Sequence, residues 1–216
     1  MTGNDRRGRT IGHIFTFAVR PALIRKLYPV MPGDITIAAD CGLATAQALG
    51  CPADLVVGDF DSLSRGSVPG QAEVLASPVE KDDTDTFLAV KAALTRGCRL
   101  IEIAGGLGGR QDHSLANLGA LQYIHEHGAE GLISAEKERV FFLSGGTRTF
   151  DFPRGSVFSV IPWGSDASGV CIKGARYPLS MAVLRTSESL GISNEALGPV
   201  EISVLNGYLM IFLNFL

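Results

Sequence analysis

The chain has 216 residues, of which 46% are hydrophobic and 19% charged, and its formal net charge is -3. This balance excludes the basic excess typical of nucleic-acid-binding proteins and the charge-rich composition of disordered chains. The length suffices for one large domain or two small ones. The four cysteines form no CxxC pair, so we expect no zinc site. Scattered cysteines are typical of the reducing cytoplasm, where we expect this protein.

The apolar segments near the two ends of the chain are too short to cross a membrane. Residues 14–19 are shorter than the core of a secretory signal, and we interpret them as a first strand. The apolar residues 208–216 fall far short of the roughly 20 that a spanning helix needs. We therefore expect no transmembrane segment.

Strand and helix signals alternate over the first two-thirds of the chain. Apolar runs predict strands at residues 35–39, 55–57, 74–76, 100–104 and 131–134, and apolar spacing predicts helices at residues 44–49, 84–96 and 114–127. This alternation predicts an α/β domain with a mainly parallel sheet flanked by helices. Such sheets bind ligands at the carboxyl ends of their strands. Asp40, Asp59 and Gly105 follow three such ends and are expected to meet in one crevice.

The pattern changes near residue 139, where helical spacing disappears. Short strands separated by Gly, Pro and Ser turns are predicted at residues 140–143, 156–161, 169–172 and 200–205. The pair Asn206-Gly207 predicts a hairpin between residues 200–205 and 208–213. We therefore expect an α/β domain over residues 11–136 and a small C-terminal all-β sandwich domain over residues 137–216.

The pair Asp59 and Asp61, followed by Ser62, comes directly after the strand at residues 55–57. Residues two apart in an extended segment point the same way, so the two carboxylates share one side. A divalent cation removes the repulsion between them, and Mg²⁺ prefers carboxylate oxygens. An Asx-turn capped by Asp61 explains the same pattern without a metal, and this alternative stays open.

A second acidic cluster, Lys81-Asp82-Asp83-Thr84-Asp85, stands at the start of the helix predicted from residue 84. Aspartate and threonine are ordinary helix caps and dipole partners. Three carboxylates and a lysine exceed what one cap requires. The excess suits a metal and phosphate site.

A glycine-rich loop, Gly105-Gly106-Leu107-Gly108-Gly109, precedes Arg110, Asp112 and His113. The chain contains neither GxGxxG nor GxxxxGK[ST], which argues against a dinucleotide fingerprint and a P-loop. Glycine still lets backbone N–H groups approach a phosphate, and Arg110 can bind phosphate oxygens with its guanidinium fork. Capping of the next helix by Asp112 or Ser114 stays open as an alternative. Asn117 lies about one helical turn beyond His113, where it would either face the same crevice or hydrogen-bond locally.

Taken together, five motifs resemble, in order and spacing, the thiamine pyrophosphokinase family. They are residues 38–42, 58–62, 81–85, 108–113 with Asn117, and 191–195. The resemblance implies an α/β catalytic domain that holds nucleotide and metal, and a β-sandwich that holds thiamine. It also implies a homodimer with active sites at the subunit interface, and Mg²⁺-dependent transfer of the diphosphate of ATP to thiamine, which releases AMP.

The resemblance also implies roles for individual residues. Catalytic residues are Asp40, Asp59, Asp61 and Asp85, and the last three hold magnesium. Residues on the nucleotide and phosphate side are Ser62, Lys81, Asp82, Thr84, Arg110, Asp112, His113 and Asn117. Residues on the thiamine side are Tyr177, Ser193 and Asn194. The sequence departs from the family where residues 17–21 replace a glycine or Asn-Gly loop, and where Cys41 replaces a glycine.

Two other enzymes and one binding protein are weighed against this reading. A diphosphokinase for another primary alcohol, such as a hydroxymethylpterin, would keep the aspartates but lose residues 191–195. A non-catalytic thiamine or nucleotide sensor would need no full metal site. A metal-dependent phosphohydrolase would release phosphate from ATP without thiamine.

Overall fold

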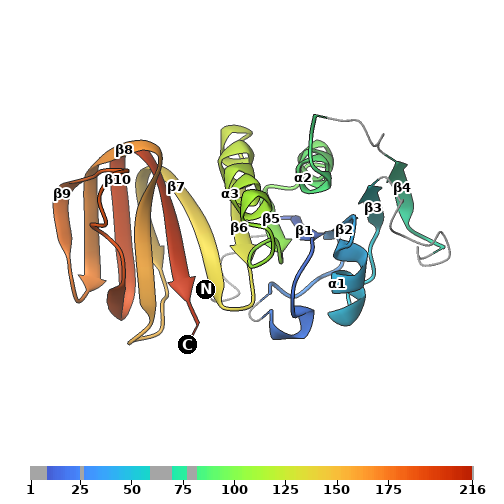
Figure 1. The fold of residues 1–216 in the computed structure, drawn as a ribbon, viewed down its shortest axis with the longest axis horizontal. Coiled ribbons are helices and arrows are strands. Elements are labelled where there is room, and N and C mark those ends of the chain that lie inside the picture. The colour runs from blue at the N-terminus through green and yellow to red at the C-terminus, as the bar shows by residue number, and fades with distance from the viewer. Residues whose placement is uncertain (1–8, 25–26, 59–69, 77–81, 216) are drawn as a thin grey trace. The chain divides into compact units, whose positions relative to one another are not determined.

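The computed structural model describes residues 9–24, 27–58, 70–76 and 82–215. The described residues fall into two compact units, one within Arg6–Glu136 and the other within Lys137–Leu216 (Figure 1). The first contains strands and helices, and the second contains strands in the residues that the structure describes. The predicted α/β class is therefore confirmed.

The first unit is built on a sheet in which each strand runs parallel to its neighbours. Its described strands are β1 (Ile11–Phe15), β2 (Ile35–Ala39), β3 (Leu55–Gly58), β4 (Glu73–Ala76), β5 (Leu100–Ala104) and β6 (Glu130–Ser134). They are arranged in the order β4-β3-β2-β1-β5-β6. The chain moves outward from β1 in one direction through β2, β3 and β4, and then in the other through β5 and β6. The reversal beside β1 is the place where open sheets of this kind bind ligands.

The helices of this unit cover both faces of the sheet. Those in the described residues are the 3-10 turn η2 (Pro21–Leu23), α1 (Gly42–Ala48), α2 (Asp85–Thr95) and α3 (Gln111–Glu126). Figure 1 shows α1 on one face and α2 and α3 on the other. The helix α1 packs Leu43 against Ala38 and Val56, and Ala46 against Phe15. Within the described residues, no helix is long and apolar enough to cross a membrane.

The strand β1 begins at Ile11 rather than at the predicted residue 14. The added part of the strand contains His13, a polar residue that can be buried because acidic side chains lie beside it. His13 is 1% exposed. Its Nδ1 lies 3.2 Å from Oε2 of Glu102 in β5, and its Nε2 lies 3.5 Å from Oδ2 of Asp34 before β2. Ser134 in β6 donates to the other oxygen of Glu102 at 2.6 Å. Polar side chains from three strands, β1, β5 and β6, and from the residue before β2 therefore lie close together in the interior.

The second unit has longer strands than the sequence predicted. They are β7 (Glu138–Phe150), β8 (Val157–Ala175), β9 (Leu179–Leu184) and β10 (Asn194–Asn214). The strand β10 pairs with β7 and β8, and β9 pairs with β8. Phe150, Phe152 and Phe158 pack in succession, the first pair stacked and the second tilted, with ring centroids 5.1 and 5.5 Å apart. This aromatic row fills the interior of the unit with large apolar surfaces.

The predicted Asn206-Gly207 hairpin is wrong. Pairing with β7 continues across these residues, because Val204 lies opposite Gly146 and Tyr208 lies opposite Ser144. The Asn-Gly pair forms an irregularity within β10, and Gly207 has a positive φ of 92°. A side chain at Gly207 would come within 2.9 Å of the Cα atom of Ala167. Glycine therefore serves close packing here and not a chain reversal.

Candidate functional site

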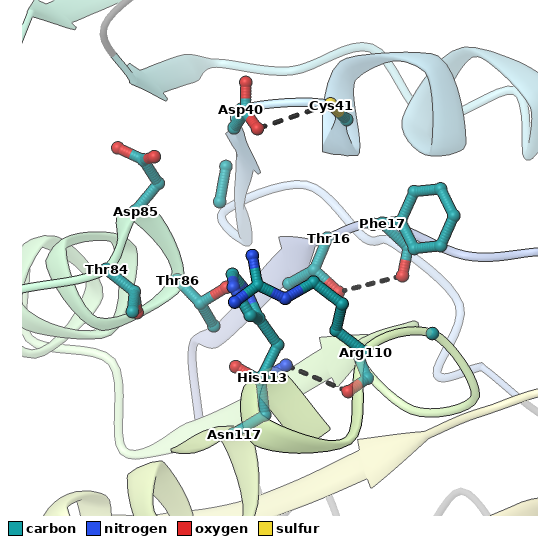
Figure 2. Close-up of a pocket in the computed structure, with 13 residues that line it drawn as sticks. Thr16, Phe17, Asp40, Cys41, Thr84, Asp85, Thr86, Arg110, His113 and Asn117 are labelled. Atoms are coloured by element: carbon teal, nitrogen blue, oxygen red, sulfur yellow. Dashed lines mark hydrogen bonds between the residues drawn. The ribbon is translucent and has the colours of Figure 1, made fainter. Parts of the chain in front are cut away.

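A cavity of about 580 Å³ opens in the first unit at the carboxyl ends of the strands. Residues that follow β1, β2 and β5 line it, together with the first turns of α2 and α3 (Figure 2). The lining residues are Thr16, Phe17, Ala39, Asp40, Cys41, Thr84, Asp85, Thr86, Gly106, Gly109, Arg110, His113 and Asn117. Three separate predicted motifs therefore meet in one cavity.

The backbone of Asp40 adopts a left-handed conformation that residues with a side chain rarely adopt. Its φ is 47°, and its N–H donates to the carbonyl of Val57 at 2.8 Å. The next residues leave β2 directly into α1, and Gly42 allows this because a Cβ there would lie 1.9 Å from the carbonyl oxygen of Phe15. Cys41 donates its thiol hydrogen to Oδ2 of Asp40 at 3.3 Å. Strained backbone held by its surroundings is typical of functional positions.

Neighbouring residues in the described part of the second acidic cluster, residues 82–85, make different contacts. Asp83 accepts a hydrogen bond from Lys91 Nζ at 2.5 Å. Thr84 caps α2 by accepting the N–H of Phe87 at 3.3 Å. Thr84 and Asp85 line the cavity, whereas Asp82 is exposed and is not among the lining residues. The capping interpretation and the site interpretation therefore both apply, to different residues of one motif.

The glycine-rich loop is fixed by residues that also line the cavity. Asn117 donates through Nδ2 to the carbonyl of Gly106 at 2.9 Å, and the N–H of Gly106 donates to the carbonyl of Phe17 at 2.9 Å. Gly105 and Gly106 both have positive φ, and a Cβ on Gly106 would lie 2.7 Å from Nδ2 of Asn117. Asn117 is 7% exposed, so its contribution is to hold the loop as well as to border the cavity.

Arg110 and Asp112 form a bidentate ion pair at the start of α3. Nε of Arg110 lies 3.1 Å from Oδ1 of Asp112, and the second contact, from its NH2 group, is 2.6 Å. The hydrogen bond from Arg110 lowers the pKa of Asp112 to about 2, and the same hydrogen bond raises the pKa of Arg110. Because α3 begins at Gln111 and not at Ser114, Asp112 and His113 lie in its first turn. His113 lines the cavity, whereas Asp112 reaches it through Arg110.

The cavity residues Thr16, Phe17 and Thr86 were not among the predicted site residues. Thr16 and Phe17 were assigned to the interior of a strand, whereas β1 ends at Phe15. Thr86 follows the acidic cluster and carries no signal of its own. Asp59, Asp61, Ser62 and Lys81 lie outside the described residues.

The donor atoms at this cavity suit a hard cation. Asp40 and Asp85 present carboxylates to it from two different elements (Figure 2). Carboxylate oxygens are the protein ligands that Mg²⁺ prefers. The described residues alone hold no group of three metal-binding side chains. A complete metal site would thus require residues beyond these two.

A smaller cavity of about 270 Å³ lies in the second unit. It is bordered by Tyr177, Leu179, residues 189–192 and Asn194. Asn194 is 4% exposed, whereas the Tyr177 ring is 59% exposed. The sequence predicted Tyr177, Ser193 and Asn194 as neighbours of one ligand. Tyr177 and Asn194 line this cavity together, whereas Ser193 adjoins it in sequence and contacts Ser159.

Two family profiles match the two parts of the chain. The profile described as "Thiamin pyrophosphokinase, catalytic domain" matches residues 31–132, and "Thiamin pyrophosphokinase, vitamin B1 binding domain" matches residues 148–209. Together they cover well over half of the chain. The chain belongs to the thiamin pyrophosphokinase family. A curated relative, "Thiamine pyrophosphokinase" of Bacillus subtilis strain 168, is 30% identical over 164 residues, which are 74% of this chain and 77% of the relative.

Solved thiamin pyrophosphokinases share the fold. The crystal structure from Bacillus subtilis has a TM-score of 0.84 at 25% identity, covering 96% of this chain and 99% of that one. The structure from Geobacillus thermodenitrificans has a TM-score of 0.80 at 25% identity, covering 95% and 97%. The Candida albicans enzyme has a TM-score of 0.76 at only 12% identity, covering 96% and 90%, and this likeness concerns the fold alone.

Membership of the thiamin pyrophosphokinase family confirms the predicted family and function. The chain is an enzyme that transfers pyrophosphate, with ATP and thiamine as its substrates. Neither the hydroxymethylpterin diphosphokinase nor the non-catalytic sensor is favoured, because both halves of the chain match thiamin pyrophosphokinase profiles.

Proposed function

We propose that this chain joins the diphosphate of ATP to the primary hydroxyl of thiamine in a magnesium-dependent reaction. In this proposal, residues 11–136 hold the nucleotide and the metal, and residues 137–216 form a β-sandwich that holds thiamine. The observation that carries the proposal is the convergence of Asp40, Asp85 and Arg110 on one cavity, within the stretch that matches the catalytic profile.

The phosphate chain of ATP is assigned to the 580 Å³ cavity. The glycine-rich loop offers backbone close to that cavity, and Arg110 offers a guanidinium fork that suits phosphate oxygens. Thr84, His113 and Asn117 border the same space. We assign Ser62, Lys81, Asp82 and Asp112 to the surroundings of the nucleotide, Asp112 because it orients Arg110.

We assign the magnesium ion to Asp59, Asp61 and Asp85, and an active-site role to Asp40. The support from the described residues is that Asp40 and Asp85 are hard oxygen donors at the same cavity. When bound, magnesium neutralises charge on the phosphate chain. The chain's own residues position the two substrates so that the hydroxyl meets the phosphorus in line.

The reaction forms one bond and breaks one. The oxygen of the thiamine hydroxyl bonds to the β-phosphorus of ATP, and the bond between that phosphorus and the oxygen bridging to the α-phosphorus breaks. The bridging oxygen leaves with AMP, and the hydroxyl proton passes to a carboxylate or to water. Arg110 stabilises negative charge that develops on the migrating group, because it remains cationic throughout the accessible pH range.

Thiamine is assigned to the smaller cavity, with Tyr177, Ser193 and Asn194 as its neighbours. The ring of Tyr177 is exposed at that cavity and offers a face to the cationic thiazolium ring. The amide of Asn194 is engaged with the backbone of Tyr177. We therefore assign Asn194 the task of holding Tyr177 in place.

We also propose a homodimer and a cytoplasmic location. The dimer rests on the family resemblance. The apolar stretch at residues 208–213 adds no argument for a dimer, because Leu209, Met210 and Ile211 are already buried within a single chain. The four cysteines are free thiols, which agrees with a reducing compartment.

The test is to identify the products formed from ATP, Mg²⁺ and thiamine. We expect AMP and thiamine diphosphate in equal amounts, no reaction with thiamine monophosphate, whose hydroxyl is blocked, and no reaction in EDTA. ADP with thiamine monophosphate would mean attack on the γ-phosphorus and would overturn the assigned step. Release of inorganic phosphate without a thiamine product would instead indicate a phosphohydrolase.

A further inference from the structure

The loop at residues 189–194, which borders the smaller cavity, is fastened to the strand β8 by two consecutive residues. The N–H of Val160 donates to the carbonyl of Gly191 at 2.9 Å. The hydroxyl of Ser159 accepts the N–H of Ser193 at 3.1 Å. The loop lies so close to β8 that a Cβ on Gly191 would come within 2.4 Å of the carbonyl oxygen of Val160.

The bond to Ser159 is made where the loop is strained. Ser193 has a φ of 56°, in the left-handed region that residues with a side chain rarely adopt. Such a conformation persists only when neighbouring groups hold it in place. Directly after Ser193 the chain enters Asn194, whose amide fixes the backbone of Tyr177. The conformation of Ser193 therefore determines the position of the loop relative to Tyr177.

We propose that Ser159 is a positioning residue for thiamine binding, an inference that rests on the proposed assignment of thiamine to this cavity. Ser159 is 8% exposed and is not among the residues that line the cavity. It acts through Ser193, because its hydroxyl holds the N–H of that residue. Its effect is expected on the thiamine side, because its partners among the described residues, Ser193 and Phe212, both belong to the second unit.

The variant Ser159→Ala removes the acceptor and leaves the loop residues in place. We expect the KM for thiamine, and its Kd measured by calorimetry without ATP, to rise about two- to tenfold, which is the usual range for one lost hydrogen bond. We expect kcat and the KM for ATP to stay within about twofold, because the phosphate cavity is untouched. The variant Ser159→Cys keeps a weaker acceptor and should give an intermediate KM for thiamine.

Ser168→Ala is the matched control. Ser168 lies on the same strand, and its hydroxyl accepts a hydrogen bond from the Asn206 side chain at 3.3 Å and not from the loop. It should lose a hydrogen bond without changing the KM for thiamine. Stability measured by thermal unfolding separates general weakening of β8 from a specific effect on binding.

Each outcome decides the proposal. An unchanged thiamine KM and Kd in folded Ser159→Ala would overturn it, and so would an equal rise for Ser168→Ala. If Ser159→Ala fails to fold, an unchanged thiamine KM in Ser159→Cys overturns it. A wild-type enzyme that makes no thiamine diphosphate refutes the proposed function instead, and wild-type thiamine binding measured without ATP distinguishes the two failures.

Discussion

Both ends of the Asn194 side chain bind the backbone of a single residue, Tyr177. Oδ1 of Asn194 accepts the N–H of Tyr177 at 3.0 Å, and Nδ2 donates to its carbonyl at 2.7 Å. The same Oδ1 accepts the N–H of Glu195 at 2.9 Å. A primary amide provides a donor and acceptors in this arrangement, and a carboxylate does not.

Asn194→Asp should therefore weaken thiamine binding and stability together. The substitution keeps the acceptor but replaces the donor by an oxygen that faces the carbonyl of Tyr177. We expect a loss of about 1–3 kcal/mol in the free energy of unfolding and a rise of about tenfold in the KM for thiamine. Urea denaturation and steady-state kinetics measure the two effects. Asn206→Asp, an exposed amide on the same strand, is the control and should change neither by much.

The two glycines Gly106 and Gly108 separate backbone strain from damage to the cavity. Both have positive φ, 77° and 93°, so alanine at either should cost about 1 kcal/mol in strain. A Cβ at Gly106 would also lie 2.7 Å from Nδ2 of Asn117, whereas no described atom lies within 4 Å of one at Gly108. We expect Gly106→Ala to raise the KM for ATP about tenfold or more, and Gly108→Ala to have a much smaller effect. Equal effects on the KM would show that the contact with Asn117 is unimportant.

Removal of one member of the buried group formed by His13, Asp34 and Glu102 should be strongly destabilising, because it leaves the remaining polar groups buried without that partner. The carboxylate of Glu102 lies beside His13 and accepts a hydrogen bond from Ser134. Its removal leaves buried polar groups of both residues without this partner. We expect Glu102→Ala to lower the free energy of unfolding by about 3–5 kcal/mol. Glu73, whose side chain is 62% exposed in its ion pair with Arg96, is the control, and its alanine variant should cost about 1 kcal/mol or less. Chemical denaturation of both variants measures the difference.

The arrangement of the first unit could be predicted because short, mostly apolar runs alternate with helical patterns, and three of these runs, at residues 35–39, 55–57 and 100–104, are followed by aspartate or glycine. Local patterns could not predict that β1 starts at Ile11, because the partners of His13 come from Asp34 and Glu102, which are distant in the sequence. The hairpin prediction failed for a similar reason. Gly207 packs against Ala167, and only the fold brings these two residues together.

The motifs of the candidate site could be predicted, but not which residue of each motif lines the cavity. Asp83 and Asp85 are both two-oxygen acceptors at a helix start, and their spacing does not tell which one faces the cavity. In the structure, Asp83 forms an ion pair with Lys91, about two helical turns farther along the chain, and Asp85 faces the cavity. Thr16 and Phe17 were missed because an apolar run does not reveal where its strand ends.

Asp85 and Asp83 provide a matched test of the acidic group at the cavity. Asp85 lines the cavity, whereas Asp83 is held by Lys91. Asp85→Asn removes one negative charge from the proposed magnesium site, so we expect kcat to fall about a hundredfold or more, as when an electrostatic contact to the reacting group is lost. Asp83→Asn should lower kcat less than about threefold, since the partly exposed ion pair with Lys91 lies outside the cavity and such pairs contribute little. The magnesium concentration that gives half-maximal rate should rise for Asp85→Asn alone, because only that variant loses a ligand. If Asp83→Asn lost as much activity as Asp85→Asn while both remained folded, the acidic cluster would act through the start of α2 and not through a metal ion.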